Sequence, residues 1–231
     1  MITESAPNII YEDNHLLVLG KPAGMPVVPD SSKDYSLFDW GRDYIKKTKN
    51  KPGNVFLAVV HRIDRPVSGL VCFARTSKAA SRLSRQMREG IVSKEYLAVT
   101  KNAPKSYEGV VENYLKKDRK RNITRIVSGK EAGAKRAITR WQVIGKRKGR
   151  HLFHLVPVTG RPHQLRIHLA KVLDSPILGD IKYGSDEKVL EGRALALHSW
   201  KLCFNHPTGR HQMQLTAPVP SHFPFKPPFL F

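Results

Sequence analysis

The sequence predicts an α+β fold, in which a mixed, largely antiparallel β-sheet is flanked by a few helices. Segments rich in β-branched and aromatic residues outnumber those with helical periodicity, and short turns separate most of them. The chain has 231 residues, of which 40% are hydrophobic and 26% charged, and this is enough apolar material for a packed core. We therefore expect residues 1–231 to form a single domain.

The first third of the chain contains four predicted strands and one helix. Asn8–Tyr11 and His15–Gly20 are apolar runs on either side of a polar turn, which predicts a hairpin. Ser36–Lys49 has helical periodicity and starts with a residue favoured at the N-cap. Val55–Val60 and Gly69–Ala74 are rich in β-branched and aromatic residues and predict two further strands.

The remaining two thirds alternate between strands and two helices. Ser77–Arg88 predicts a basic amphipathic helix, and Pro162–Leu173 predicts another, because proline is favoured at the first helical position. Residues 116–136 are interpreted as a long functional loop. The proline-rich tail, residues 218–231, is expected to lie extended over the surface. Strands are predicted at Lys94–Thr100, Gly109–Tyr114, Ala137–Val143, His151–Val158, Leu195–Phe204 and Gln212–Thr216.

The chain is strongly basic. Forty Lys and Arg residues stand against nineteen Asp and Glu, a formal net charge of +21. Residues 116–150 hold fourteen of the basic residues and two of the acidic ones. A compact protein with this charge repels itself unless a polyanion is near, so nucleic acid is the first partner to consider. An anionic membrane surface and a merely solvated loop region are the alternatives.

The sequence also indicates the compartment. No apolar run reaches the roughly 18 residues of a transmembrane helix, and the first residues lack the basic and apolar regions of a signal peptide. Cys72 and Cys203 lie inside apolar runs and are interpreted as reduced core residues. We therefore expect a cytoplasmic protein that does not associate with membranes.

One polar segment lies between two predicted core strands. It places a carboxylate, Asp64, between Arg62 and Arg65, with His61 close by in sequence. Pro66 prevents a continuous strand, so these side chains should project from a loop that a rigid scaffold holds. A surface turn with a structural Asp–Arg pair would give the same pattern.

The segment resembles the catalytic motif of pseudouridine synthases of the RluA type, in the RsuA/RluA family. Here it reads HRIDRPVSGL, where the family commonly has HRLDxxTSGL. The resemblance extends in order over about residues 9–220. Its further elements are Lys21-Pro22-Ala23-Gly24, Lys94-Glu95-Tyr96-Leu97-Ala98, Thr159-Gly160-Arg161-Pro162-His163-Gln164-Leu165-Arg166-Ile167-His168, Ile177-Leu178-Gly179-Asp180 and Phe204-Asn205-His206-Pro207.

The resemblance implies an enzyme that isomerises uridine to pseudouridine in a structured RNA, either ribosomal or transfer RNA. Such enzymes cleave the N1–C1′ bond, turn the uracil and rejoin it through C5, without a cofactor, metal or nucleotide. It also implies a basic RNA-binding cleft across the sheet. The chain is expected to begin at the catalytic domain, without the S4-type domain of many relatives, and to act as a monomer. Pro66 and Val67 depart from the family motif, but the aspartate is retained.

The resemblance assigns catalytic roles to Asp64, Tyr96 and Arg166. Cleavage needs an anion beside C1′, and an ordinary carboxyl group, with a pKa of about 3.9, is ionised at neutral pH. Whether Asp64 attacks C1′ or C6, or takes the C2′ proton, stays open. Arg166 matches the family's aspartate-pairing arginine, which would keep a desolvated carboxylate charged. Tyr96 would pack against the flipped base and take part in proton transfer at C5, although a strand tyrosine is more often part of a core.

A second group of residues is expected to contact RNA or the flipped base. Arg62 is the candidate for the wedge that fills the space left by the base. Basic residues near the predicted loop would meet phosphates, and the histidine-containing helix would line the site. The candidates are His61, Arg62, Arg161, His163, Gln164, Lys117, Lys120 and Arg121.

Other functional classes fit the sequence less well. His163 and His168 are five residues apart with no acidic residue between them, so no zinc motif is formed. Neither a phosphate-binding glycine loop nor a serine nucleophile elbow occurs. The serious alternative is a non-catalytic RNA-binding or ribosome-assembly factor on the same scaffold. Asp64 argues against that alternative, because a carboxylate in a basic groove would repel phosphate.

Overall fold

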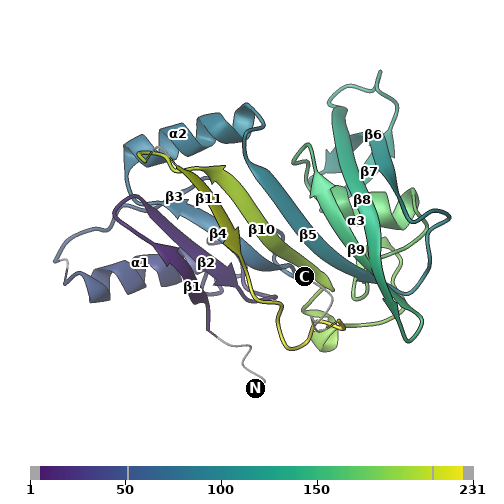
Figure 1. Ribbon diagram of the computed structural model, residues 1–231, viewed down its shortest axis with the longest axis horizontal. Coiled ribbons are helices and arrows are strands. Elements are labelled where there is room, and N and C mark those ends of the chain that lie inside the picture. Colours follow the sequence, from purple (N-terminus) through teal and green to yellow (C-terminus); the bar gives the residue numbers. More distant parts are fainter. Residues whose placement is uncertain (1–5, 51, 210, 226–231) are drawn as a thin grey trace. The chain divides into compact units, whose positions relative to one another are not determined.

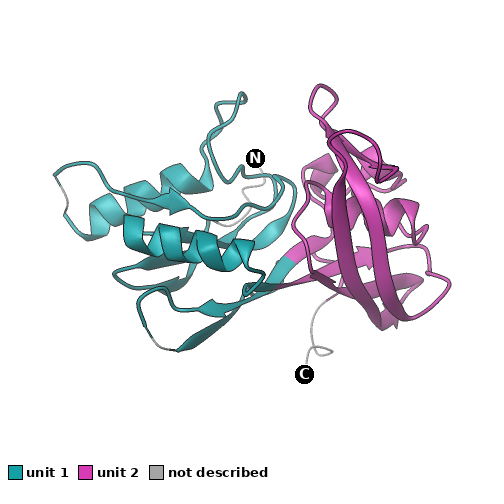
Figure 2. Ribbon diagram, turned by 90° about the horizontal axis from the view of Figure 1, so that it is seen from above, with its two compact units in different colours: residues 1–93, 199–220 teal, residues 94–198, 221–231 magenta. Residues whose placement is uncertain are grey.

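The structure is a computed structural model that describes residues 6–50, 52–209 and 211–225 (Figure 1). The chain divides into two compact units, coloured separately in Figure 2. Unit 1 consists of Met1–Ser93 and Ser199–Pro220, and unit 2 of Lys94–His198 and Ser221–Phe231. Unit 2 is therefore largely an insertion between two segments of unit 1.

Unit 1 is a sheet with one helix on each face. Helix α1 (Leu37–Thr48) and helix α2 (Ser77–Arg88) provide the two covering layers. The central strands are buried on both faces, and this explains why their sequences are continuous apolar runs. The strands follow the order β1 (Asn8–Glu12), β2 (Leu16–Lys21), β4 (Ser68–Ala74), β10 (Leu197–Asn205) and β11 (Gln212–Thr216), and β3 (Ala58–Val59) pairs with β4.

Side-chain alternation along the central strands divides the core of unit 1 into two clusters. Leu16 and Val18 of β2 pack with Ala79 and Leu83 of α2. The neighbouring Leu17 and Leu19 point to the other face, where they pack with Leu37 and Ile45 of α1. Because successive strand residues face opposite ways, a shift of one residue in register would exchange the two clusters.

Unit 2 is an antiparallel sheet with a single helix packed on it. Helix α3 (Gln164–Lys171) is buried from Gln164 through Ala170. It packs its Ile167 and Ala170 against Leu115 and Ala137 of the sheet. Two short 3₁₀ turns follow it, η1 (Ile181–Tyr183) and η2 (Leu190–Gly192). The strand order is β5 (Ser93–Thr100), β9 (Arg150–Pro157), β8 (Lys135–Arg147), β6 (Glu108–Asp118) and β7 (Ile123–Val127).

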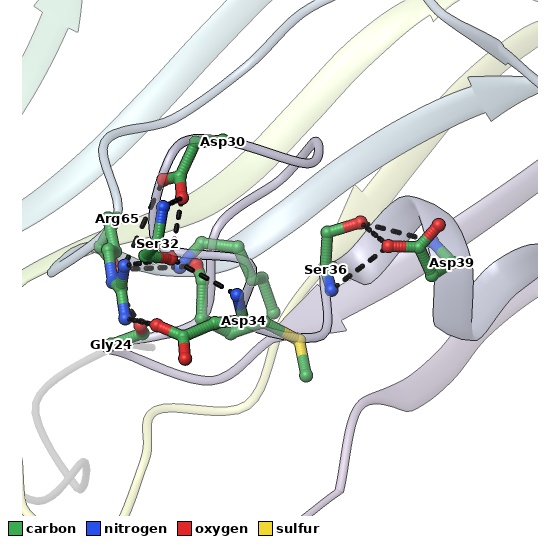
Figure 3. A network of polar contacts seen from close by, with 9 residues as sticks. Gly24, Asp30, Ser32, Asp34, Ser36, Asp39 and Arg65 are labelled. Atoms are coloured by element: carbon green, nitrogen blue, oxygen red, sulfur yellow. Dashed lines mark hydrogen bonds and ion pairs between the residues drawn. The ribbon is translucent and has the colours of Figure 1, made fainter.

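The structure confirms the predicted α+β class with a largely antiparallel sheet. Helix α2 and strand β11 have the predicted bounds. Ser36 caps α1 as expected. Its hydroxyl accepts the backbone N–H of Asp39 at 3.2 Å, and the Asp39 carboxylate accepts the N–H of Ser36 at 3.3 Å (Figure 3). Within the described ranges, no helix has the length and hydrophobicity needed to cross a lipid bilayer.

Three local predictions are wrong. The strand predicted at Val55–Val60 shrinks to Ala58–Val59, because Val55 and Leu57 pack in the core cluster of α1 without pairing in the sheet and the chain leaves the sheet after Val59. Residues 116–136 are not one long loop but the end of β6, all of β7 and the start of β8. Their charged side chains hide the strand pattern, since one face of this sheet is solvated. The described part of the tail does not simply lie over the surface, because the side chains of Phe223 and Phe225 are buried.

Candidate active site

His61 ends the pairing of β3 with β4 and starts the loop that carries Asp64. The two strands pair only as far as Val59 opposite Phe73. Beyond this pair, the backbone N–H of Cys72 donates to Nε2 of His61 at 2.9 Å, so an imidazole takes the place of a strand carbonyl. Because Nε2 accepts this hydrogen bond, it carries no proton. The side chain of His61 thus fixes the point at which the loop leaves the sheet.

Asp64 lies in a tight turn at the end of this loop. Its backbone carbonyl accepts the N–H of Val67 at 3.0 Å. Asp64 is partly buried, whereas Arg62 is exposed. Val67 is 3% exposed, so its departure from the family's threonine is a packing change beside the turn.

The buried ammonium group of Lys21 binds the backbone of this loop. The side chain is 2% exposed. Its Nζ donates to the backbone carbonyls of Pro22 at 2.9 Å, Met25 at 2.7 Å and Arg65 at 2.9 Å. The backbone N–H of Gly24 donates to the same Arg65 carbonyl at 2.9 Å. The KPAG element therefore fixes the backbone of the residue that follows Asp64.

Arg65 ties the same loop to the segment before α1 (Figure 3). Its Nε donates to the carbonyl of Gly24 at 2.8 Å, and its Nη1 donates to Oγ of Ser32 at 3.0 Å. Its Nη2 donates to the carboxylate of Asp34, and Asp30 lies 3.8 Å from Nη1. Hydrogen bonds from Arg65 lower the pKa of Asp34, and hydrogen bonds from Ser32 lower that of Asp30. These contacts are exposed, so they orient the loop more than they stabilise the fold.

In unit 2, Arg166 is held by a carboxylate that sequence reasoning did not pair with it. Its Nε and Nη2 each donate to Asp180 at 2.7 Å, which is the two-point geometry of a planar guanidinium and a carboxylate. Both side chains are buried, and the guanidinium lies 5.1 Å from the ring centre of Tyr183. Asp180 ends the Ile177-Leu178-Gly179-Asp180 element. A charged residue directly after apolar ones was the feature of the sequence that could have indicated a buried ion pair. The predicted contact of Arg166 with Asp64 stays a prediction.

His163 is the centre of a buried polar chain at the start of α3. Its backbone has a φ of 53°, in the left-handed region, so the helix begins two residues later than predicted from Pro162. Nζ of Lys117 lies 2.9 Å from Nε2, and the Tyr183 hydroxyl lies 2.8 Å from Nδ1. An ammonium only donates, so Nε2 accepts and the proton of the ring is on Nδ1. The Tyr183 hydroxyl in turn donates to the carbonyl of Thr124 at 3.2 Å.

Gln164 braces the loop before α3 against the sheet. Its amide makes hydrogen bonds through both the oxygen and the nitrogen, and the residue is 3% exposed. The predicted role of Gln164 in binding the base stays a prediction, as does that of Arg161, whose Nε donates to the carbonyl of Arg136 at 2.9 Å. The partners of Gln164 are Thr159 Oγ1 at 2.7 Å, Arg161 N at 3.0 Å, Ile138 O at 2.9 Å and Thr139 Oγ1 at 3.0 Å.

The remaining predicted site residues of unit 2 lie on its strands β5 and β6 and in the turn that follows β6. Tyr96 is 9% exposed and stands opposite Leu155 in the β5–β9 pair. Lys120 and Arg121 are exposed in the turn between β6 and β7. Lys117 differs from these two, because it is half-buried and also donates to the side chain of Asn122. The structure thus separates one structural lysine from two solvent-facing cations.

Comparison with known proteins identifies the family. A family model described as RNA pseudouridylate synthase matches residues 15–171, which include Asp64, Tyr96 and Arg166. The chain belongs to the RNA pseudouridylate synthase family. It is therefore an RNA pseudouridine synthase, an isomerase of uridine in RNA, and the non-catalytic alternative is not favoured.

Three relatives illustrate this membership. The ribosomal large subunit pseudouridine synthase C of Haemophilus ducreyi is 33% identical over 226 residues, covering 96% of this chain and 68% of that protein. The dual-specificity RNA pseudouridine synthase RluA of Vibrio cholerae is 33% identical over 213 residues, covering 91% and 82%. The solved structure of human RNA pseudouridylate synthase domain containing 4 has a TM-score of 0.77 and 27% identity, covering 93% of this chain and 89% of that one.

The first prediction concerns Lys21. Lys21→Met should leave buried carbonyls without a donor and lower the free energy of unfolding by about 2–5 kcal/mol. Turnover should also fall at temperatures where the variant remains folded, because the Asp64 loop loses its support. Urea denaturation and single-turnover rates measure the two effects. Lys78→Met, which removes an exposed lysine from α2, is the control and should change neither. Wild-type stability in Lys21→Met would contradict this role of the ammonium.

The second prediction concerns the buried ion pair of unit 2. Asp180→Asn keeps the shape of the side chain but removes the buried negative charge that accepts two hydrogen bonds from the Arg166 guanidinium, which should cost about 3–5 kcal/mol. Denaturant melts give the free energy of unfolding directly. Asp186→Asn removes an exposed carboxylate that pairs with Lys101 at 2.8 Å and should leave stability unchanged. Equal melts for the two variants would show that the Asp180 pair does not support the fold.

Proposed function

We propose that Asp64 supplies the carboxylate for the isomerisation, with Arg166 and Tyr96 acting on the same uridine. The observation that carries this proposal is the support given to one aspartate-bearing loop. A buried lysine and an arginine network fix the backbone on one side of Asp64, and His61 fixes it on the other. A loop with this much support presents its carboxylate in a defined place, as a group that must meet one carbon atom requires.

The chemistry proposed for Asp64 follows from the bonds that change. The N1–C1′ bond breaks, a C5–C1′ bond forms, and the proton on C5 is lost while N1 gains one. An anionic carboxylate can stabilise or trap the sugar carbon while the uracil is detached. Asp180 accepts two N–H donors of Arg166, and we propose that the rest of the guanidinium serves Asp64. Tyr96 would hold the detached ring and assist the proton transfer at C5.

RNA binding is assigned to the exposed cations. The target base must leave its stack, at a cost of a few kcal/mol, before C1′ becomes reachable. Arg62 is exposed beside the Asp64 turn, and we propose that its side chain fills the space that the flipped base leaves in the RNA stack. The exposed turn that carries Lys120 and Arg121 would contact the phosphate backbone. Lys117 supports His163, and its predicted contact with RNA stays a prediction.

The proposed substrate is the RNA of the large ribosomal subunit. Several similar proteins, among them those of Haemophilus ducreyi and Rickettsia bellii, are named as ribosomal large subunit synthases. One relative is named as a dual-specificity enzyme, so a second RNA, such as transfer RNA, belongs in the same test. We further propose that the protein acts in the cytoplasm as a monomer, without metal or nucleotide.

The third prediction tests Asp64. Asp64→Asn should keep the fold and the affinity for RNA but abolish conversion, because an amide cannot supply the anion. Release of tritium from RNA labelled at uridine C5 measures turnover. Asp174→Asn, at an exposed turn residue, is the control and should retain activity. Conversion by Asp64→Asn above about 1% of the wild-type rate would remove Asp64 from the mechanism.

The fourth prediction tests the basic turn. If Lys120 and Arg121 each neutralise one phosphate, replacing both with Gln should reduce the slope of log affinity against log salt by about 1.4–1.8. Single-turnover rates at saturating enzyme should stay close to wild type, since neither side chain takes part in the chemistry. The control changes Lys46 and Lys47, exposed in the last turn of α1, to Gln and removes the same charge. Equal slopes for the two double variants would assign the effect to net charge alone.

A further inference from the structure

Lys94 is a desolvated cation at the start of β5. Burial lowers the pKa of its ammonium group. Among the described residues, none accepts a hydrogen bond from Lys94 or forms an ion pair with it. Most of the other basic side chains of unit 2 discussed above have such partners, including Arg166 and Lys117. A partly buried ammonium with no acceptor among the described residues is well placed to receive a charged partner from outside the chain.

The position of Lys94 relates it to the candidate catalytic residues of unit 2. Side chains two residues apart on a strand share a face, so Lys94 lies on the same face of β5 as Tyr96. A Cβ atom built on Gly160 would lie 3.5 Å from Nζ of Lys94. The ammonium therefore rests against the backbone of the loop that leads into α3. A methyl group at position 160 would be in ordinary van der Waals contact with this cation.

Burial changes steadily along the start of β5. Ser93 is exposed, Lys94 is partly buried, and Tyr96 is 9% exposed. The cation thus lies nearer to solvent than the aromatic ring on the same face. A nucleotide that inserts its base toward Tyr96 would keep its charged backbone at the level of Lys94. A lysine is also a compact point charge that suits a phosphate oxygen.

We propose that Lys94 binds a phosphate group that flanks the uridine to be isomerised. The proposal rests on the assignment of Tyr96 to the flipped base. It adds a substrate-binding residue whose partner is the RNA backbone, next to the base but distinct from it. No group in the part of the chain that the structure describes accepts a hydrogen bond from this ammonium, and the phosphate would supply an acceptor.

The test compares Lys94→Met with the wild-type protein on a fluorescein-labelled RNA stem-loop that has uridines in its loop. The stem-loop is made with natural phosphates, and again with uncharged methylphosphonates on the 5′ or the 3′ side of the loop uridines. We expect Lys94→Met to bind the natural RNA about tenfold more weakly. Its slope of log affinity against log salt should be shallower by about 0.7–0.9. Its melting temperature should equal or exceed that of the wild type, because a desolvated charge has been removed.

The modified RNA separates a phosphate contact from other effects. One methylphosphonate position should weaken wild-type binding about as much as Lys94→Met does, and should weaken binding by the variant no further. Lys101→Met removes an exposed lysine that follows the same strand, and it should respond to methylphosphonate as the wild type does. An equal loss for Lys94→Met and wild type at every position, or a lowered melting temperature, would overturn the proposal.

The proposed function is checked separately by tritium release from the wild-type protein. Binding measurements on Lys94→Met do not need turnover, so they decide the role of Lys94 even if conversion fails. A variant that binds normally but converts slowly would place the ammonium at the uracil, and this too would overturn the phosphate assignment.

Discussion

The ammonium group of Lys21 is the interaction on which the Asp64 loop depends. A buried lysine is tolerated when its donors are satisfied, and here three backbone carbonyls accept from it. Two of these carbonyls belong to the turn that follows β2, and the third belongs to Arg65, forty-four residues further along the chain. One cation therefore joins two loops that have no strand pairing with each other. Further hydrogen bonds of His61, Arg65 and the backbone of Gly24 hold the same loop in one orientation.

In unit 2, the predicted site residues are held by hydrogen bonds among buried side chains at helix α3. The helix is short and almost completely buried, so its polar residues cannot rely on water. Asp180 accepts two hydrogen bonds from Arg166, Gln164 contacts four groups, and His163 belongs to a chain that runs from Lys117 to Thr124. Hydrogen bonds from several sides favour one orientation for each of these three side chains, because rotation would leave a buried donor or acceptor unpaired. His168 on the same helix is different, since its Nδ1 lies 2.9 Å from Thr139 Oγ1 while its buried Nε2 has no hydrogen-bond partner among the described residues. The αL conformation of His163 is held by this network.

Helices and strands whose apolar residues repeat with the period of the element could be predicted from the sequence. Strands that carry charged residues on a solvated face could not. Helix α2 and strand β11 are amphipathic in the ordinary way and have the predicted bounds. Strands β6 and β7 carry arginine and lysine on a solvated face, so their pattern resembles that of a loop. In the site, the Asp64 loop could be predicted because apolar segments flank it on both sides in the sequence. The pairing of Arg166 with Asp180 and the tautomer of His163 could not, since both depend on which distant side chain completes the hydrogen bonding.

The division of the chain has a consequence for synthesis on the ribosome. Unit 1 is complete only when β10 and β11 have been made, and more than a hundred residues of unit 2 are translated before them. Until then, the edge of β4 that β10 will cover has unpaired backbone groups. At about 5–20 residues per second, this exposure lasts roughly 5–20 seconds. The N-terminal segment is therefore a candidate for protection by a chaperone during translation. Unit 2 is completed later still, because its buried Phe223 and Phe225 follow the last segment of unit 1.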